Sequence, residues 1–194
     1  MKTTKIAILG KGNVGGALGR GLARSYSSVQ VVGHDQTAQR QAATQAEVVI
    51  LAVPFPAIDD VVQNLGTALD GKVVVDATNA LTPDYQLAVG YTTSGAEELQ
   101  KKLPRARVVK AFNTVFAQHM DSGKVGTTPI TALVSADDAA AKQTVVTLAQ
   151  DIGFETVDAG PLKNARLLEP VCFLNIQLGY MLGLGTQIGF KLVR

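Results

Sequence analysis

Seven apolar runs of strand length, separated by stretches of helical character, most strongly constrain how this chain can fold. They are "KIAILG", "VQVVGH", "EVVILAVP", "KVVVDATN", "ARVVKAFN", "ITALVSA" and "FETVDAG". The runs are continuous rather than alternating, which is typical of strands in a parallel sheet whose two faces are covered by helices. The sequence therefore predicts an α/β fold with a doubly wound, mostly parallel sheet.

Helices are expected between these strands, and a longer helical segment closes the chain. The expected helices span residues 14–26, 37–44, 57–65, 96–103, 115–122, 137–151 and 162–184. About a dozen residues separate the second run from the third, which leaves room for one short helix. No linker or repeat divides the 194 residues, so we expect one compact unit.

Composition excludes several classes of function. The formal net charge is only +2 and no basic block is present, which argues against binding to nucleic acid or to an anionic membrane surface. The apolar runs are too short for a membrane span, and no signal-peptide pattern precedes the first strand, so a cytoplasmic location is expected. The single cysteine, Cys172, lies in an apolar run and is expected to act as a small buried hydrophobic residue.

A glycine loop follows the first predicted strand and precedes the first predicted helix. Gly10, Gly12 and Gly15 form the pattern G-x-G-x-x-G. In that context the first glycine permits a tight turn, the second lets a pyrophosphate approach the backbone, and the third lets the helix pack closely on the sheet. Lys11 does not make this a nucleotide-triphosphate loop, because G-x-x-x-x-G-K-[ST] is absent. The loop predicts a dinucleotide-binding site.

The end of the second strand leaves the choice between NAD and NADP open. Asp35 stands twenty residues after Gly15, roughly where such domains place the residue that reads the ribose. A carboxylate there favours the free 2′-hydroxyl of NAD. His34, one residue earlier, can instead donate a hydrogen bond to the 2′-phosphate of NADP.

Three further segments are expected to line one crevice at the carboxyl ends of the strands. They are "AVPFPAI", "DATNAL" and "KAFNTV". Their neutral amides and hydroxyls suit hydrogen bonds to a carboxamide or ribose, although such residues are also ordinary turn formers. The sequence has no Ser-His-acid set of supporting spacing and no cluster of metal ligands. Hydride transfer between two bound cofactors needs alignment rather than a protein acid or base, and a crevice of this composition is compatible with it.

Several motifs resemble, in order and over most of the chain, the coenzyme F420-dependent NADP oxidoreductase family. They are "ILGKGNVGGALGRGLA", "VVILAVPFPAI", "KVVVDATNAL", "VVKAFNTV" and "VDAGPLKNARLLEPVCFLNIQLGY". The resemblance implies a Rossmann domain, here residues 1–160, and a short C-terminal helical extension, residues 161–194. It also implies NADP as the cofactor, a homodimer, and hydride transfer between NADPH and a flavin-like acceptor such as coenzyme F420. Ferric reductases of the metalloreductase group share a related cofactor domain.

This sequence departs from the family where the 2′-phosphate is held. The family usually has serine and arginine after the second-strand glycine, whereas this chain has His34 and Asp35 after Gly33. We nevertheless expect NADP, with NAD as the alternative, because His34 replaces the serine and Arg40 could reach the phosphate. Asp35 would then pair with Arg40 or cap the following helix.

These arguments give the expected site. The residues expected to hold the dinucleotide are Gly10, Lys11, Gly12, Asn13, Val14, Gly15, Gly33, His34, Asp35, Ala52, Val53, Pro54, Ala57 and Asn79. Lys110, Asn113 and Thr114 are expected on the acceptor side, and no metal is expected. Two alternatives stay open: an imine or ketone reductase with Lys110 or His119 as proton donor, and a non-enzymatic NADP-binding redox sensor.

Overall fold

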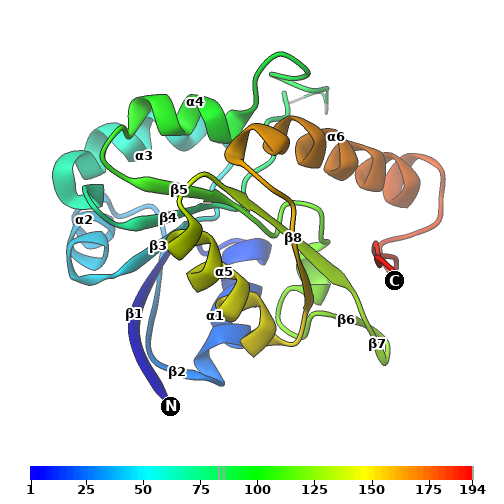
Figure 1. Cartoon of the computed structure of the whole chain (residues 1–194), viewed down its shortest axis with the longest axis horizontal. Coiled ribbons are helices and arrows are strands. Elements are labelled where there is room, and N and C mark those ends of the chain that lie inside the picture. Colours follow the sequence, from blue (N-terminus) through cyan, green and yellow to red (C-terminus); the bar gives the residue numbers. More distant parts are fainter. Residues whose placement is uncertain (83, 85, 194) are drawn as a thin grey trace.

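The computed structural model describes residues 1–82, 84 and 86–193 (Figure 1). Within these residues, seven strands form one sheet in the order β2-β1-β3-β4-β5-β8-β9. The strands are β1 (Lys2–Leu9), β2 (Tyr26–Val32), β3 (Val48–Leu51), β4 (Val73–Asp76), β5 (Arg107–Lys110), β8 (Thr131–Ala136) and β9 (Glu155–Asp158). The first five strands in this order run parallel, β8 pairs antiparallel to β5, and β9 pairs parallel to β8. The sheet is therefore mostly parallel, as predicted.

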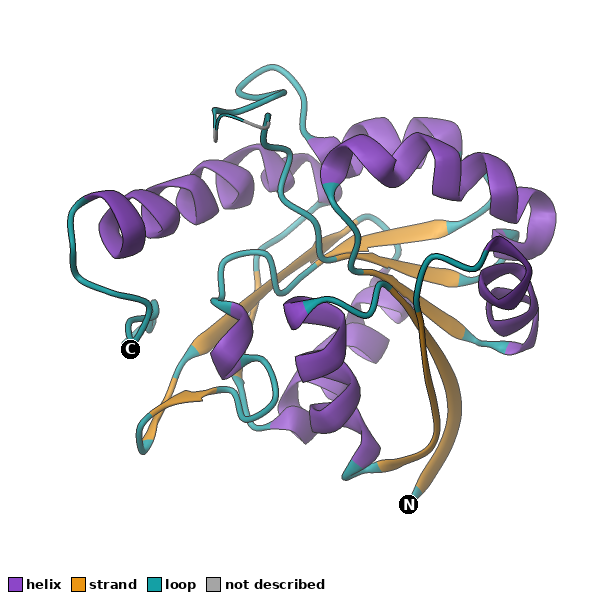
Figure 2. Cartoon of the chain, turned by 180° about the vertical axis from the view of Figure 1, so that it is seen from behind, coloured by secondary structure: helices purple, strands orange, loops and turns teal. Residues whose placement is uncertain are grey.

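Helices cover both faces of this sheet (Figures 1 and 2). They are α1 (Asn13–Ala23), α2 (Gln36–Gln45), α3 (Ile58–Leu65), α4 (Gly95–Lys102), α5 (Ala139–Ile152) and α6 (Ala165–Ile176). Successive strand residues point to opposite faces. In β1, Ile6 and Ile8 belong to the core shared with α1 and α5, whereas Ala7 and Leu9 belong to the core shared with α2, α3 and α4. This double burial explains the continuous apolar runs, and the predicted Rossmann fold is confirmed.

The strand order reverses direction at β1. The chain leaves β1 for β2 on one side and later returns to β3 on the other. In open sheets of this kind, ligands bind outside the carboxyl ends of the strands at such a reversal. The glycine loop after β1 stands at this point.

Two predicted helices differ from the structure. Residues 115–122 form only a short 3-10 helix, Ala117–His119, because the preceding loop turns sharply: Phe112 has φ +68° and Val115 donates its amide to the Phe112 carbonyl. The predicted helix at 14–26 ends at Ala23, and Tyr26 already begins β2. A small hairpin of β6 (Lys124–Val125) and β7 (Thr128–Pro129) was not predicted.

The closing segment, predicted as one helix over residues 162–184, is divided into three parts and ends at Met181. A 3-10 helix, Leu162–Asn164, precedes α6, and one turn of π-helix, Gln177–Met181, follows it. α6 lies beside α4, at the upper right of Figure 1. No helix in the described part of the chain is long and apolar enough to cross a membrane.

Candidate functional site

Gly10, Gly12 and Gly15 differ in the space available for a side chain. Gly10 has φ +119°, and a Cβ atom there would lie 2.1 Å from the carbonyl oxygen of Ala52. A Cβ at Gly15 would lie 1.9 Å from the carbonyl oxygen of Gly10, so α1 packs directly on the turn. At Gly12, by contrast, no described atom lies within 4 Å of the Cβ position. The first and third glycines are required by the fold, whereas the second keeps a surface open.

The N-terminus of α1 faces that open surface. Gly12 is the N-cap residue, and among the described side chains none caps this helix. The first intrahelical bond comes from the amide of Gly16 to the carbonyl of Gly12, 2.9 Å, so helix geometry leaves the amides of Asn13, Val14 and Gly15 without intrahelical partners. Such amides, with the positive end of the helix dipole, bind anions.

A surface hollow adjoins this helix end. It is lined by Lys11, Gly12, Asn13, Gly16, Arg20, Ala117 and Gln118. Lys11 and Arg20 bring positive charge to it, and Arg20 makes only long contacts, 3.4 Å, to the carboxylate of Asp121. The hollow therefore combines free amides with two cations, which is a suitable environment for phosphate.

Asp35 and Arg40, which follow β2, bond to different partners and not to each other. The carboxylate of Asp35 accepts a hydrogen bond from the amide of Ala38, 2.9 Å, and caps α2. Arg40 does not pair with Asp35, because its guanidinium donates to the carbonyl of Asn64, 2.9 Å. Of the two roles predicted for Asp35, the structure shows the helix cap.

His34 and Lys11 flank the end of β2 on its open side. His34 is exposed. The aliphatic part of Lys11 lies beside Gly33, where a Cβ would stand 3.4 Å from the Lys11 Cδ atom. Both side chains are thus available to a ligand at this end of the site.

The end of β3 lies directly beside the glycine loop. Ala52 donates its amide to the carbonyl of Leu9, 2.8 Å, and its own carbonyl oxygen is the atom that Gly10 approaches. Val53 is partly buried and Pro54 is exposed. Pro54 then starts the 3-10 helix Phe55–Ala57, in which Ala57 donates to the Pro54 carbonyl, 2.9 Å. The proline makes a stiff turn directly after the residues that contact the glycine loop.

The end of β4 is a buried polar turn. The Asp76 carboxylate accepts hydrogen bonds from the amide and the hydroxyl of Thr78, 2.9 and 2.7 Å, through its Oδ1 atom. Asn79 follows and is partly exposed. Its Oδ1 atom is buried, and no described group donates to it. A buried amide oxygen without a donor is unusual in proteins, and a turn of the partly exposed Asn79 side chain would present it to a donor on a ligand.

Lys110, at the end of β5, does not face an open crevice. Its side chain is 0% exposed, and Nζ donates to Asp76 Oδ2, 3.0 Å, and to the Thr78 carbonyl, 2.8 Å. Nζ also lies 3.1 Å from Glu169 Oε1 on α6. Burial alone would lower the pKa of Lys110, but the two carboxylates outweigh it and raise the pKa above its usual value. Lys110 is a buried cation between two carboxylates.

Asn113 and Thr114 are also turned inward, beneath α6. Asn113 donates its side-chain amide to the carbonyl of Leu168, 3.0 Å, and Asn175 donates to the carbonyl of Thr114, 3.2 Å. His119, the other residue considered as a proton donor, is buried, with Nε2 2.9 Å from the carbonyl oxygen of Thr186. The expected acceptor-side residues are therefore enclosed side chains that join the β5 loop to α6.

Sequence reasoning missed Glu169 and Asn175. Both are almost completely buried, and each is an isolated polar residue within the apolar run of α6. A charged residue inside such a run is rarely buried unless it is paired, so this pattern could have pointed to them. Cys172 is buried in the same helix, as predicted, and burial raises the pKa of its thiol to about 12.

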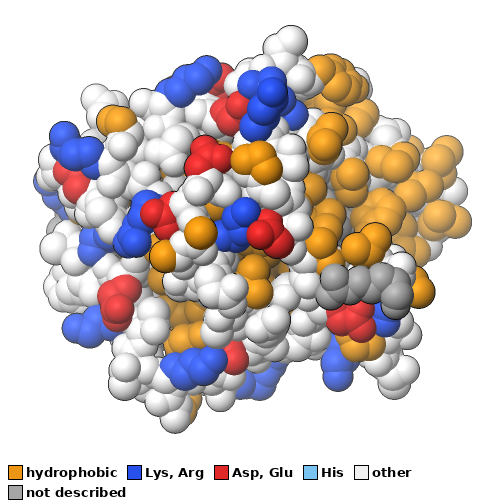
Figure 3. Space-filling view, viewed as in Figure 1, with side chains coloured by type: hydrophobic (Ala, Val, Ile, Leu, Met, Phe, Trp, Pro, Cys, Tyr) orange, Lys and Arg blue, Asp and Glu red, His pale blue; other side chains and the backbone are white. Residues whose placement is uncertain are grey.

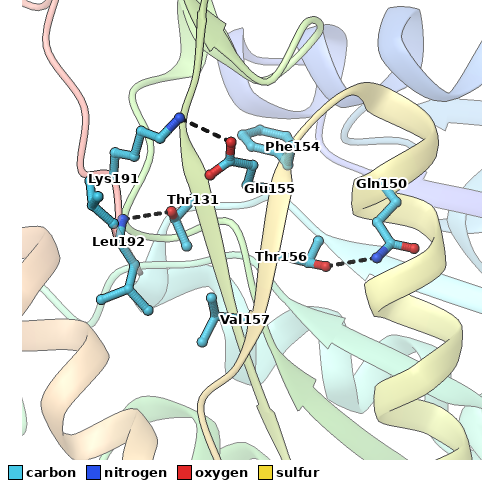
Figure 4. A pocket seen from close by; sticks show the side chains of 9 residues that line it. Thr131, Gln150, Phe154, Glu155, Thr156, Val157, Lys191 and Leu192 are labelled. Carbon is cyan, nitrogen blue, oxygen red and sulfur yellow. Dashed lines mark hydrogen bonds and ion pairs between the residues drawn. The ribbon is translucent and has the colours of Figure 1, made fainter.

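A separate hollow lies where the C-terminal residues meet β8 and β9 (Figure 4). Lys191 pairs with Glu155 across it, 3.0 Å, and the Leu192 amide donates to the Thr131 hydroxyl, 2.9 Å. These bonds attach the C-terminal residues to the sheet. Among the described residues, no group of three potential metal ligands occurs here or elsewhere.

Known proteins resemble this chain in sequence and in fold. Residues 32–80 match the family model described as NADP oxidoreductase, coenzyme F420-dependent. The F420-dependent NADP reductase of Methanocaldococcus jannaschii is 31% identical over 150 residues, which cover 72% of this chain and 65% of that protein. The crystal structure of a candidate F420-dependent NADP reductase from Arthrobacter sp. FB24 is 29% identical, with a TM-score of 0.89 over 98% of this chain and 99% of that one. The predicted resemblance to the coenzyme F420-dependent NADP oxidoreductase family is confirmed.

The chain is also similar in sequence to a metalloreductase. Metalloreductase STEAP3 from Rattus norvegicus is 31% identical over 181 residues, which cover 86% of this chain but 36% of that protein. This chain thus spans about a third of the metalloreductase and 65% of the archaeal reductase. Its likeness to the F420-dependent family extends over nearly its full length in the Arthrobacter structure.

Proposed function

We propose that this chain is an NADP-dependent oxidoreductase that transfers a hydride between NADP(H) and a small, flavin-like acceptor. The observation that carries the proposal is the uncovered N-terminus of α1 at its N-cap residue Gly12. This helix end lies where the strand order reverses. The free amides there suit a pyrophosphate. The names of the relatives, F420-dependent NADP reductases, support the same cofactor.

The rest of the site fits a dinucleotide extended across the sheet edge. His34 and Lys11 are available to the adenine ribose, and the Asp35 carboxylate is already engaged as a helix cap. At the other end, the unpartnered Oδ1 of Asn79 could accept a hydrogen bond from the carboxamide of a nicotinamide. The proposal favours NADP, because Lys11 is cationic and His34 is exposed, whereas Asp35 directs one carboxylate oxygen to the amide of Ala38.

The chemistry of the reaction would come from the cofactor. NADPH, when bound, supplies a hydride, and the protein has to hold it, orient it and keep water away. Val53 and Pro54, which follow β3 directly, would give the nicotinamide an apolar wall. The two predicted proton donors, Lys110 and His119, are enclosed by their partners. Their burial argues against an imine or ketone reductase that depends on either residue.

A screen of acceptors tests the proposal. Purified protein would be mixed with NADPH and, in turn, with coenzyme F420, FMN, FAD, riboflavin or a quinone, and NADPH oxidation followed at 340 nm, the usual wavelength for the reduced nicotinamide. We expect turnover with at least one acceptor, and loss of that turnover in Gly12→Val. Tight NADPH binding without any turnover would instead support the redox sensor.

A further inference from the structure

The bonds between α6 and the sheet converge on one buried group of side chains, here called the Lys110 cluster: Asp76, Thr78, Lys110 and Glu169. Lys110 lies between the two carboxylates, at 3.0 Å from Asp76 and 3.1 Å from Glu169. All four residues are at most 4% exposed. One cation and two anions are thus enclosed together.

Glu169 extends this cluster to α4. Its carboxylate accepts hydrogen bonds from the amides of Gly95 and Ala96, 2.9 and 3.3 Å, at the start of that helix. These amides and the helix dipole offset the excess negative charge. A Cβ atom at Gly95 would lie 3.0 Å from the Phe55 ring and 3.1 Å from Ala80, so the loops after β3 and β4 both pack against this point.

The cluster also determines the orientation of one particular peptide group. Lys110 donates to the carbonyl of Thr78, 2.8 Å. That carbonyl and the amide nitrogen of Asn79 belong to the same planar peptide unit. Asp76 fixes the other side of the turn through the amide and hydroxyl of Thr78. Any shift of Lys110 would therefore turn the peptide that carries Asn79.

Attachment of α6 does not by itself require such a cluster. Removing charges from water is costly, and a buried ion pair often contributes no more stability than apolar residues of similar volume would. Another pair already joins α4 and α6 nearer the surface, because Arg166 binds both carboxylate oxygens of Glu97, 2.7 and 2.8 Å. The buried cluster is thus better suited to fixing a conformation than to stabilising the fold.

We propose that Lys110 and Glu169 are positioning residues, which hold the Thr78–Asn79 peptide so that Asn79 can bind the nicotinamide half of the cofactor. The inference rests on the proposed function, and it makes α6 part of the cofactor site without contact between α6 and the ligand. The adenine half, at the glycine loop and the end of β2, is outside the reach of this cluster.

Two matched variants test this. Glu169→Gln removes one of the two buried negative charges that face Lys110, whereas Glu97→Gln weakens the Arg166–Glu97 pair between α4 and α6. The affinity of each for NADPH, and for adenosine 2′,5′-bisphosphate as the adenine half alone, would be measured by isothermal titration calorimetry. We expect Glu169→Gln to weaken NADPH binding about fivefold or more and to leave the bisphosphate within about twofold. Glu97→Gln should leave both ligands within about twofold of the unaltered chain.

A second variant covers the case in which Glu169→Gln does not fold. Thr78→Val keeps all three charges but removes the hydroxyl bond to Asp76, and should weaken NADPH binding by about twofold to fivefold without affecting the bisphosphate. The inference would be overturned if these variants weakened the binding of NADPH and of the bisphosphate equally, or left both affinities unchanged. Absence of NADPH binding in the unaltered chain would overturn the proposed function itself, so the two failures are distinguishable.

Discussion

Two loops at the carboxyl edge of the sheet, one after β1 and one after β5, use their residues in opposite ways. In the loop after β1, Gly12 and the amides of α1 remain open. In the loop after β5, all residues from Ala111 to Phe116 are buried, and Asn113 and Thr114 bond to α6. A position at the carboxyl end of a parallel strand therefore does not by itself bring a polar side chain to a ligand. A helix that covers the strand end, such as α6, can instead bind that side chain by hydrogen bonds.

The largest effect is expected from Lys110→Met, which leaves two buried carboxylates without their cation. Breaking a buried ion pair in this way typically costs about 3–5 kcal/mol of unfolding free energy. Lys101→Met is the matched control, because Lys101 pairs with Glu98 on the exposed face of α4, where solvent screening leaves such a pair little effect on stability. Urea unfolding would measure both. Equal losses of unfolding free energy in the two variants would show that the buried charges around Lys110 stabilise the fold no more than an exposed ion pair does.

The glycine loop should separate stability from binding. Gly15→Ala places a Cβ against the carbonyl of Gly10, and we expect a loss of roughly 1–3 kcal/mol in unfolding free energy. Gly12→Val places its side chain in open space, so its melting temperature should stay near that of the unaltered chain. Its affinity for NADPH should fall about tenfold or more. If Gly12→Val bound NADPH normally, the loop would not be the phosphate site.

The two faces of α6 differ in the same manner as the two loops. The inner face carries the buried polar bonds, whereas the outer face and the residues after it expose large apolar side chains (Figure 3). Those more than half exposed are Leu167, Leu174, Tyr180, Met181, Leu182 and Leu184. Such a patch is typical of a surface that binds a partner, and we propose that a second copy of this chain covers it.

Light scattering at micromolar concentration should therefore report the mass of a dimer. Leu174→Lys introduces a charge into the outer face, away from the inner polar bonds, and should weaken dimerisation about tenfold with little change in melting temperature. A monomer in the unaltered chain would refute the proposed dimer.

The smallest effects are expected at the ribose end. If His34 contacts the 2′-phosphate, His34→Ala should weaken NADPH binding a few-fold, because it removes a hydrogen-bond donor to the phosphate. NADH, which lacks the phosphate, should change less. Asp35→Asn keeps an oxygen for the helix cap and removes a negative charge, so it should modestly strengthen NADPH binding. NADH binding as tight as NADPH binding in the unaltered chain would show that Asp35 reads the ribose.

The sequence alone determined the features that depend on local pattern. Continuous apolar runs predicted the seven strands of the main sheet, because strands between two helical layers are buried on both faces. The glycine spacing predicted a turn at Gly10, an open backbone at Gly12 and close helix packing at Gly15. Each of these features depends on only a few neighbouring residues.

Only the tertiary structure decided what depends on residues far apart in the chain. Lys110 meets Glu169, and Asn113 meets Leu168, across more than fifty residues, and no periodicity encodes such a meeting. The antiparallel pairing of β8 with β5 likewise joins residues far apart in the chain, such as Val109 and Ala136. Lys110, Asn113 and Thr114 were predicted on the acceptor side of the site, but the structure encloses all three beneath a covering element. That element is α6, whose buried Glu169 pairs with Lys110 at the end of β5.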